Sequence, residues 1–545
     1  MLEASAGTGK TFTIAALAAR YVAEGTPLEK LLMVTFTRMA TGELRERVRE
    51  RLLSAEQGLA RALAGVAPSD DDQVVALLAG GSAEEVTERH GRLTRALAEF
   101  DAATIATTHG FCQEVLGGLG IAGDTEADST FIEDVGDLLE EVVDDLYVRR
   151  FHSRETPPFE REEAMRIARV AVANPTARIE PAAAPEASTP AMRRRLALAV
   201  RQELERRKRA ASVLTYDDLL TRLAETLNGV SGPALIARLR ARYRVVLVDE
   251  FQDTDPMQWD IMRRTFADAG GALVLIGDPK QAIYAFRGAD VYAYLEAAKE
   301  AATRATLDVN WRSDQGLIDA YDALFAGAKL GHEGIVYRRV RAAESNQASR
   351  LVGAPDPSPL RVRVVHRDEP SLALTNKGYA VVQSAREHVA ADLAGDLVAL
   401  LSSPAEVEIR SKEGLALGRE AVRPGHVAVL VRTHKNAALV RDALDEVDIP
   451  AVINGAGSVF ATDPARDWLR LLEALERPSS SSRAGSAALT PFLGWSAEEV
   501  ASAGEERWDS LHRRLHGWAR VLRVQGVAAL TETVTLLEDL SLIHI

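Results

Sequence analysis

A glycine-rich stretch near the start of the sequence has the form of a phosphate-binding loop. Gly7 and Gly9 permit backbone conformations that turn amide N–H groups toward phosphate oxygens, and the helix expected after Lys10 adds its positive N-terminal dipole. Lys10 would neutralise the β and γ phosphates of ATP, and Thr11 would ligate Mg²⁺. The residues expected to hold the nucleotide are Ala4, Ser5, Ala6, Gly7, Thr8, Gly9, Lys10 and Thr11.

A second stretch supplies the acidic groups that such a site needs. Residues 243–250 have the sequence YRVVLVDE, a hydrophobic strand that ends in two acids. At the end of this strand Asp249 can hold the magnesium ion, and Glu250 can orient and deprotonate the attacking water. The loop alone is a weaker indication, because Ala4 stands where the first glycine of the general pattern would be. Two acids on a solvated turn are the alternative interpretation, which the presence of both motifs disfavours.

These residues must be positioned by a parallel β-sheet, and short apolar runs predict its strands. Runs rich in β-branched residues alternate with amphipathic helical stretches, a pattern typical of α/β proteins. The helix after the loop has an apolar face that would pack on the sheet. That face consists of Ile14, Leu17, Ala18, Tyr21 and Val22. The five predicted strands are 31–36, 245–248, 273–276, 360–365 and 427–431.

Six segments together resemble the helicase motifs of superfamily 1, in the order in which that family carries them. They are 3–13 (EASAGTGKTFT), 34–37 (VTFT), 107–113 (TTHGFCQ), 248–256 (VDEFQDTDP), 276–290 (IGDPKQAIYAFRGAD) and 310–313 (NWRS). The third and fifth segments are more similar to the RecB branch of the superfamily than to UvrD, Rep or AddA. The resemblance extends to about residue 500 and is weaker after residue 330.

The resemblance implies the fold and the remaining catalytic residues. The fold would be that of a RecA-like P-loop NTPase, with motor domains built on a parallel sheet and an inserted helical subdomain. Gln281 would sense the γ-phosphate. Arg312 would act as an arginine finger, since a planar guanidinium offers two donors to the charged phosphoryl oxygens, although a surface arginine is the alternative. Gln252 and Asp253, two and three residues after Glu250, are placed to couple nucleotide state to DNA.

Residues that would contact a DNA strand form a further group. Tyr284 and Phe286 lie two residues apart in an extended segment, which directs both rings to one face, where they could stack on bases. Stacking tolerates any base sequence and contributes ~1 to 3 kcal/mol per base, which suits a motor that moves along DNA. Two core aromatics, and a structural histidine at position 109, are the alternatives. Matches to strand-contacting positions of the family add Phe36, Thr37, His109 and Arg287.

Length and composition predict a folded protein of several domains, because 545 residues exceed the ~250 to 300 at which a single core stops growing. Hydrophobic residues make up 47% and charged residues 26%, which excludes collagen-like and wholly disordered classes. The single cysteine, Cys112, excludes an internal disulfide and a CxxC metal site. Without an apolar run of ~18 residues or a signal sequence, we expect a cytoplasmic protein with no membrane partner. The net charge of −14 disfavours a surface coated in positive potential but allows a local basic and aromatic groove.

Changes in amino-acid composition along the chain divide it into five expected segments. Charged helical sequence with a Pro/Ala-rich run at 175–190 indicates an insertion, and low-complexity connections lie at 353–359 and 478–486. The segments are 1–115 (motor domain 1A, first part, with the phosphate loop), 116–209 (inserted helical subdomain 1B), 210–330 (motor domain 1A, second part), 331–476 (motor domain 2A, first part) and 477–545 (start of helical subdomain 2B). Only three residues precede Ala4, and later helicase motifs are not found. We therefore expect a truncated chain that binds ATP weakly and unwinds DNA poorly.

The resemblance implies an ATP-dependent 3′→5′ DNA helicase subunit of a RecBCD-type (exonuclease V) helicase-nuclease, acting in double-strand break repair and recombination. Its partners would be single-stranded DNA, duplex DNA ends and RecC-like and RecD-like subunits. The family's C-terminal nuclease domain is not found in this sequence. A UvrD- or AddA-like repair helicase is the alternative within the class. A non-catalytic helicase-fold subunit predicts loss of catalytic residues, and a small-molecule P-loop kinase leaves the aromatic motif and residues 310–313 unexplained. The five catalytic residues, all present, are Lys10, Asp249, Glu250, Gln281 and Arg312.

Overall fold

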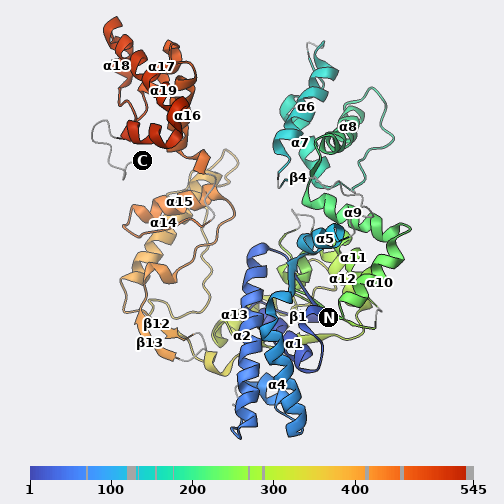
Figure 1. The fold of residues 1–545 in the computed structure, drawn as a ribbon. Helices are drawn as coiled ribbons and strands as arrows, with labels where there is room; N and C mark the ends of the chain where they lie inside the picture. The colour runs from blue at the N-terminus through green and yellow to red at the C-terminus, as the bar shows by residue number, and fades with distance from the viewer. Residues whose placement is uncertain are drawn as a thin grey trace. The chain divides into compact units, whose positions relative to one another are not determined.

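The protein is described by a computed structural model in which the chain divides into two compact units (Figure 1). Unit 1 comprises Met1–Arg350 and Ser358–Arg361, and unit 2 comprises Leu351–Pro357 and Val362–Ile545. The structure describes residues 1–545 with the exception of 69–71, 119–129, 133, 154–155, 176, 268–269, 285–288, 412–415, 455–458 and 536–545.

Unit 1 is built on a six-stranded parallel sheet with the strand order β3-β2-β6-β7-β1-β8. All residues of β2 and β6 are buried, as expected of central strands that are covered on both faces. Because every pairing is parallel, all six strands present their carboxyl ends at the same edge. The strands are β1 (Leu2–Ala4), β2 (Leu31–Thr35), β3 (Thr104–Thr107), β6 (Val245–Val248), β7 (Ala272–Gly277) and β8 (Ala305–Leu307).

Helices cover both faces of this sheet. Along β2, Leu31 and Met33 belong to one hydrophobic cluster, whereas Leu32 and Val34 belong to the other, as the two-residue period of a strand requires. The first cluster is completed by α1 (Lys10–Ala23), α2 (Arg38–Leu63), α3 (Gln73–Leu78) and α4 (Ala83–Ala98). The second is completed by α5 (Thr108–Gly117), α9 (Tyr216–Asn228), α10 (Gly232–Arg242), α11 (Pro256–Phe266) and α12 (Val291–Glu300). The expected α/β fold with a parallel sheet is confirmed.

Three helices with a hydrophobic core of their own lie within the segment expected to be an insertion (Figure 1). They are α6 (Gly136–Phe151), α7 (Arg161–Ala173) and α8 (Thr189–Ala210). The chain enters and leaves them through a two-stranded parallel sheet of β4 (Thr130–Phe131) and β5 (Val213–Leu214). The buried ammonium of Lys208, near the end of α8, contacts Asp218 of α9 at 2.7 Å, which ties the helices to the sheet-containing part of unit 1.

The rest of unit 1 lies after β8. There β9 (Val309–Asn310) pairs in parallel with β10 (Arg341–Ala342), and α13 (Gln315–Phe325) lies between them in sequence.

Unit 2 contains a small antiparallel sheet, a pair of helices and a helical bundle. The sheet consists of β11 (Leu351–Val352), β12 (Glu406–Arg410) and β13 (Ala416–Ala421). The paired helices are α14 (Val382–Leu401) and α15 (His434–Asp445). The bundle consists of α16 (Asp463–Glu476), α17 (Ser481–Ala488), α18 (Ala497–Ser502) and α19 (Glu505–Thr535).

Two of the five predicted strands are wrong. Residues 360–365 and 427–431 form no strand, and most of their apolar side chains are exposed, Val362 by 74% and Leu430 by 96%. A buried parallel strand needs hydrogen-bonded neighbours and cover on both faces, whereas these two runs pair with no described strand and are mostly uncovered. An apolar run therefore indicates extended backbone without showing that partner strands exist. Among the described residues, no helix combines the length and apolar character needed to cross a bilayer.

Candidate functional site

The glycine-rich loop connects β1 to α1 at the carboxyl edge of the sheet. Gly7 and Gly9 have φ angles of +79° and +90°, in the left-handed region that favours glycine. A Cβ atom at Gly7 would lie 2.7 Å from Oδ1 of Asn310 and 2.8 Å from Cβ of Arg312. Close packing as well as backbone conformation therefore requires glycine at position 7.

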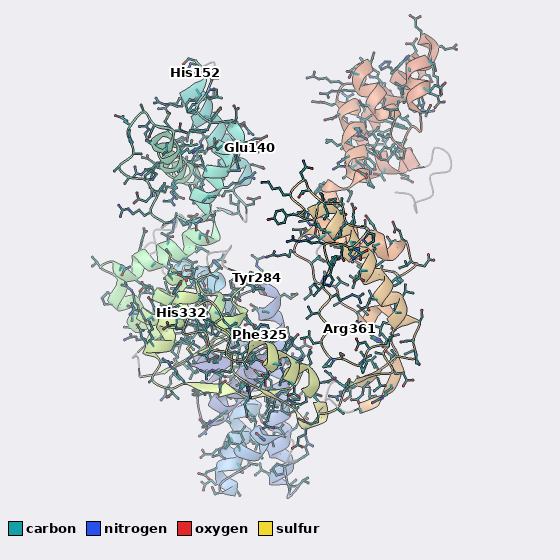
Figure 2. The ribbon with its side chains drawn as sticks, turned by 180° about the vertical axis from the view of Figure 1, so that it is seen from behind. Glu140, His152, Tyr284, Phe325, His332 and Arg361 are labelled. Carbon is teal, nitrogen blue, oxygen red and sulfur yellow. The ribbon has the colours of Figure 1, made fainter. Side chains whose placement is uncertain are left out.

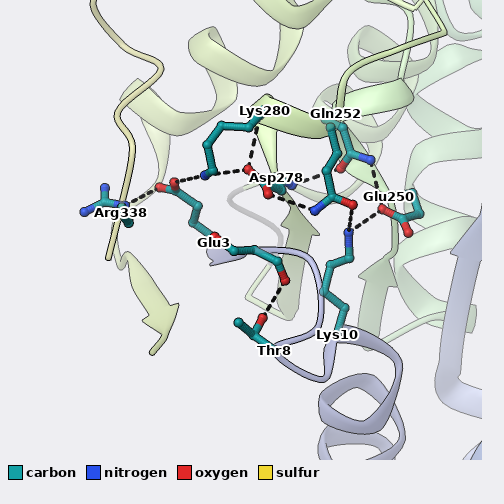
Figure 3. A network of polar contacts seen from close by, with 10 residues as sticks. Glu3, Thr8, Lys10, Glu250, Gln252, Asp278, Lys280 and Arg338 are labelled. Atoms are coloured by element: carbon teal, nitrogen blue, oxygen red, sulfur yellow. Dashed lines mark hydrogen bonds and ion pairs between the residues drawn. The ribbon is translucent and has the colours of Figure 1, made fainter. Parts of the chain in front are cut away.

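The loop is closed by its own hydrogen bonds and held by residues 310–313. Thr8 donates to the carbonyl oxygen of Ser5 from its hydroxyl at 2.7 Å and from its N–H at 3.2 Å (Figure 3). The Asn310 amide donates to the carbonyl of Ala6 at 3.0 Å, and the N–H of Trp311 donates to the carbonyl of Gly7 at 2.8 Å. Ala4, which replaces the first glycine of the general pattern, is fully buried as the last residue of β1.

Lys10 brings three of the predicted catalytic residues together (Figure 3). Its ammonium donates to Oε2 of Glu250 at 2.8 Å and to Oε1 of Gln281 at 3.2 Å, across 240 and 271 positions of sequence. The sheet explains this contact, because β1, β7 and β6 are consecutive neighbours and each is followed by one of these residues. The structure therefore brings the loop lysine and two other residues predicted to be catalytic into contact.

The acid pair follows β6 directly. Glu250 has a φ of +48°, an uncommon conformation for a residue other than glycine and one that is often found at functional sites. The N–H of Glu250 donates to Oδ1 of Asp249 at 2.9 Å. Burial, together with the neighbouring charge of Glu250, raises the pKa of Asp249 to about 6. Asp249 thus carries a negative charge that its surroundings do not fully compensate.

The donor groups fit a magnesium ion held jointly with a nucleotide. Asp249 offers a carboxylate, and Thr11 in the first turn of α1 offers a hydroxyl, both of them the hard oxygen ligands that Mg²⁺ takes. In the described part of the chain, no group of three or more His, Cys, Asp or Glu side chains could hold a metal by itself. Phosphate oxygens and water would therefore complete the coordination.

Gln252 links the residues predicted to bind the nucleotide to a second region. Its side chain is buried and donates to Oε2 of Glu250 at 2.8 Å and to Oδ2 of Asp253 at 3.2 Å. The side-chain amide oxygen of Gln252 accepts from the backbone N–H of Asp278 at 3.0 Å. Burial and the charge of Glu250 raise the pKa of Asp253 to about 6. One amide group therefore contacts residues that follow two neighbouring strands, β6 and β7.

A cavity of about 890 Å³ lies between the sheet-containing part of unit 1 and the inserted helices, and Asp253 forms part of its wall. Three residues predicted to contact DNA line it, namely Phe36, Thr37 and His109. Tyr284 is labelled in Figure 2, and its ring centroid lies 5.1 Å from that of Phe36. The structure thus brings four of the six predicted DNA residues together, while 286 and 287 lie outside the described residues.

Thr37 also has a structural role that the sequence interpretation did not separate from DNA contact. The hydroxyl of Thr37 caps α2 by accepting the N–H of Ala40 at 3.1 Å. Burial lowers the pKa of His109, and the charge of Asp217 offsets part of that effect. His109 is therefore uncharged near neutral pH and would contact a strand as a neutral ring.

Two aromatic residues beside the phosphate loop were missed from the sequence. Trp311 is 65% exposed and Phe12 is 59% exposed, and a Cβ atom at Gly9 would lie 3.9 Å from both side chains. Arg312, the predicted arginine finger, is exposed next to the same loop. The signal for Trp311 was its position in the NWRS segment, of which only the arginine was singled out.

A phosphate loop at the carboxyl edge of a parallel sheet, with an acidic pair on a neighbouring strand, places the protein among the P-loop NTPases. Residues 1–302 match the family model of the UvrD/REP helicase N-terminal domain. The chain therefore belongs to the UvrD/REP helicase family.

Curated relatives are RecB subunits of RecBCD enzymes. The chain is 44% identical over 539 residues to that of Mycobacterium tuberculosis (strain H37Rv), covering 98% of this chain and 47% of the relative. It is 44% identical over 544 residues to that of Mycolicibacterium smegmatis, with the same coverage. With that of Escherichia coli K12 it is 36% identical over 337 residues, covering 60% of this chain and 27% of the relative. The chain spans about half the length of the mycobacterial relatives.

Proposed function

We propose that the protein is the ATP-dependent 3′→5′ DNA helicase subunit of a RecBCD-type helicase-nuclease that acts on double-strand breaks in the cytoplasm. The observation that carries this proposal is the contact of Lys10 with both Glu250 and Gln281, next to a cavity lined by residues expected to contact DNA. The direction of movement, the repair role and the RecC-like and RecD-like partners rest on the similarity to RecB subunits.

In the proposed reaction the loop binds the triphosphate of ATP. Asp249 and Thr11 would hold Mg²⁺, which would supply positive charge next to the β and γ phosphates. Phosphate draws the ammonium of Lys10 away from Glu250, because two phosphate groups carry more negative charge than one carboxylate. Glu250 then accepts a proton from water. The water oxygen bonds to the γ-phosphorus as the bond from that phosphorus to the β–γ bridging oxygen breaks. Gln281 and Arg312 bind the charged phosphoryl oxygens.

We propose that Gln252 transmits this change to DNA. Lys10 and Gln252 both donate to Oε2 of Glu250. When Lys10 leaves, Glu250 loses the positive charge beside the oxygen that Gln252 contacts. The other acceptor of Gln252 is Asp253, in the wall of the cavity between the sheet and the inserted helices. A movement of one amide group thus links hydrolysis to the place where the strand would lie.

The first test is DNA dependence of hydrolysis by the full-length protein assembled with its partner subunits. We expect single-stranded DNA to raise the ATPase rate about tenfold or more, within the usual range of coupling between two sites. Linear blunt-ended duplex should also stimulate, and covalently closed circular duplex of the same sequence should not, because it has no end to enter. Equal rates with and without all three DNA species would contradict the proposal.

A second prediction concerns the strand-binding cavity. Phe36→Ala should weaken binding of single-stranded oligonucleotides about tenfold, because the loss of one stacked base costs ~1 to 3 kcal/mol. Fluorescence anisotropy at fixed salt measures this affinity. Phe325→Ala is the matched control, since Phe325 (Figure 2) is another partly exposed ring of unit 1 and does not line the cavity. The same loss of affinity in both variants would contradict a specific role for Phe36.

A further inference from the structure

A chain of alternating charges runs from the strand before the phosphate loop to the loop that carries Gln281 (Figure 3). The ammonium of Lys280 lies 2.6 Å from Oδ1 of Asp278 and 3.3 Å from Oε1 of Glu3. The second oxygen of Glu3 accepts from Arg338 at 2.8 Å. The side chains of Asp278, Lys280 and Glu3 are 2%, 16% and 18% exposed, so water screens these contacts only in part.

The middle of this chain controls the orientation of Gln281. Oδ2 of Asp278 accepts from the amide nitrogen of Gln281 at 2.8 Å, which turns Oε1 of Gln281 toward Lys10. Oδ1 of the same carboxylate accepts from the backbone N–H of Lys280 at 3.1 Å. The Asp278 carboxylate therefore binds Lys280 and Gln281 at once, and the orientation of the Gln281 amide depends on how firmly that carboxylate is held.

Glu3 is well placed to hold the Asp278 carboxylate in position through Lys280. It pairs with Gly277 across the β1–β7 register, so its side chain comes from the neighbouring strand rather than from the sensor loop itself. Without the Glu3 charge, Lys280 would lose one of its two carboxylate partners, and the Asp278 carboxylate that it holds would no longer be fixed. The Gln281 amide would then lose its fixed acceptor and could rotate.

We propose that Glu3 is a positioning residue that, through Lys280 and Asp278, holds Gln281 in the orientation needed to sense the γ-phosphate. This inference rests on the proposed ATPase function. Glu3 touches neither Lys10 nor the loop residues expected to bind phosphate through any of these contacts, so it acts on the hydrolysis step and leaves nucleotide binding unchanged.

The kinetic test uses Glu3→Gln and Lys280→Met in the full-length protein. Each should lower kcat for DNA-stimulated ATP hydrolysis about tenfold and leave KM within about twofold, since an effect confined to the transition state appears in kcat. The double variant should lose no more than either single one, because both changes break the same chain of contacts. Lys280→Arg, which keeps the cation, should restore most of kcat.

Arg338→Gln is the matched control. It removes the other partner of the same carboxylate, but the Arg338 side chain is 46% exposed and does not contact Lys280. An exposed ion pair contributes little, so kcat should change less than about twofold. A loss in this variant equal to that of Glu3→Gln would overturn the proposal, as would additive losses in the double variant or a KM that rises as kcat falls.

A second readout is independent of hydrolysis. The backbone N–H of Lys280 donates to the Asp278 carboxylate, and that of Gln281 donates to the Asp278 backbone carbonyl in the same turn. Glu3→Gln should therefore speed hydrogen exchange in residues 278–281 and leave the exchange of α1 unchanged. Unchanged exchange in 278–281 would overturn the inference even if the wild-type protein hydrolysed no ATP. Absence of DNA-stimulated hydrolysis in the wild type would instead contradict the proposed function, so the two failures are distinguishable.

Discussion

Glu250→Gln is expected to reduce ATP hydrolysis at least ~100-fold while ATP binding persists, because a general base typically contributes ~10² to 10⁴ in rate. Glutamine keeps the size of the side chain and an oxygen that can accept from Lys10 but cannot take a proton from water. The variant also removes the ion pair at 2.8 Å, so Lys10 becomes more available to phosphate. Single-turnover hydrolysis and equilibrium binding of a fluorescent ATP analogue measure the two effects separately.

Glu24→Gln is the matched control for this experiment. Glu24 lies at the end of α1, where it forms an exposed ion pair with Arg20, and its substitution should leave hydrolysis unchanged. Unchanged hydrolysis in Glu250→Gln would mean that another group takes the proton. Asp253 would then be the next residue to test, since it shares the Gln252 amide with Glu250 and its pKa is raised to about 6.

The residues that carry charge in the nucleotide site were identifiable from the sequence because each has a local signature. The loop needs glycine at positions 7 and 9, and the structure shows positive φ at both. Asp249 and Glu250 follow a run of four buried apolar residues, which places them at the end of a central strand. That the loop and the acid pair share one site was predicted from their joint presence, because a magnesium-bound triphosphate needs both.

Contacts that depend on strand order were not identifiable in this way. The Glu3–Lys280 pair exists because β1 lies next to β7, and no spacing in the sequence states which strands are neighbours. The position of Trp311 beside Gly9 likewise follows from the way β9 leads the chain back to the loop. Residues 427–431 show the opposite error, because their composition suits a buried strand whereas Leu430 is 96% exposed.

Asp249→Asn is expected to abolish Mg²⁺-dependent hydrolysis and, at neutral pH, to increase the free energy of unfolding. The pKa of Asp249 is raised from 3.8 to about 6 in the folded protein. Between these values the folded state binds more protons than the unfolded state, so this residue's contribution to stability falls as the pH rises through about 4 to 6. At pH 7 the ionised carboxylate costs up to about 3 kcal/mol, which asparagine would recover while still accepting the N–H of Glu250.

Whether Asp249→Asn raises or lowers the free energy of unfolding shows whether the Asp249 charge is uncompensated or paired in the folded protein. Urea denaturation of wild type and variant should show the gain at pH 7.5 and almost none at pH 4, where the wild-type carboxyl is already largely protonated. Asp278→Asn is the matched comparison: it changes a buried acid after the neighbouring strand, but Asp278 has Lys280 as a partner at 2.6 Å. Loss of the Asp278 charge would leave the mostly buried Lys280 ammonium with only the more distant carboxylate of Glu3 at 3.3 Å, so this variant should be less stable at pH 7.5. If Asp249→Asn were also destabilising there, Asp249 would already have a compensating partner in the folded chain, and a bound cation would not be needed to offset its charge.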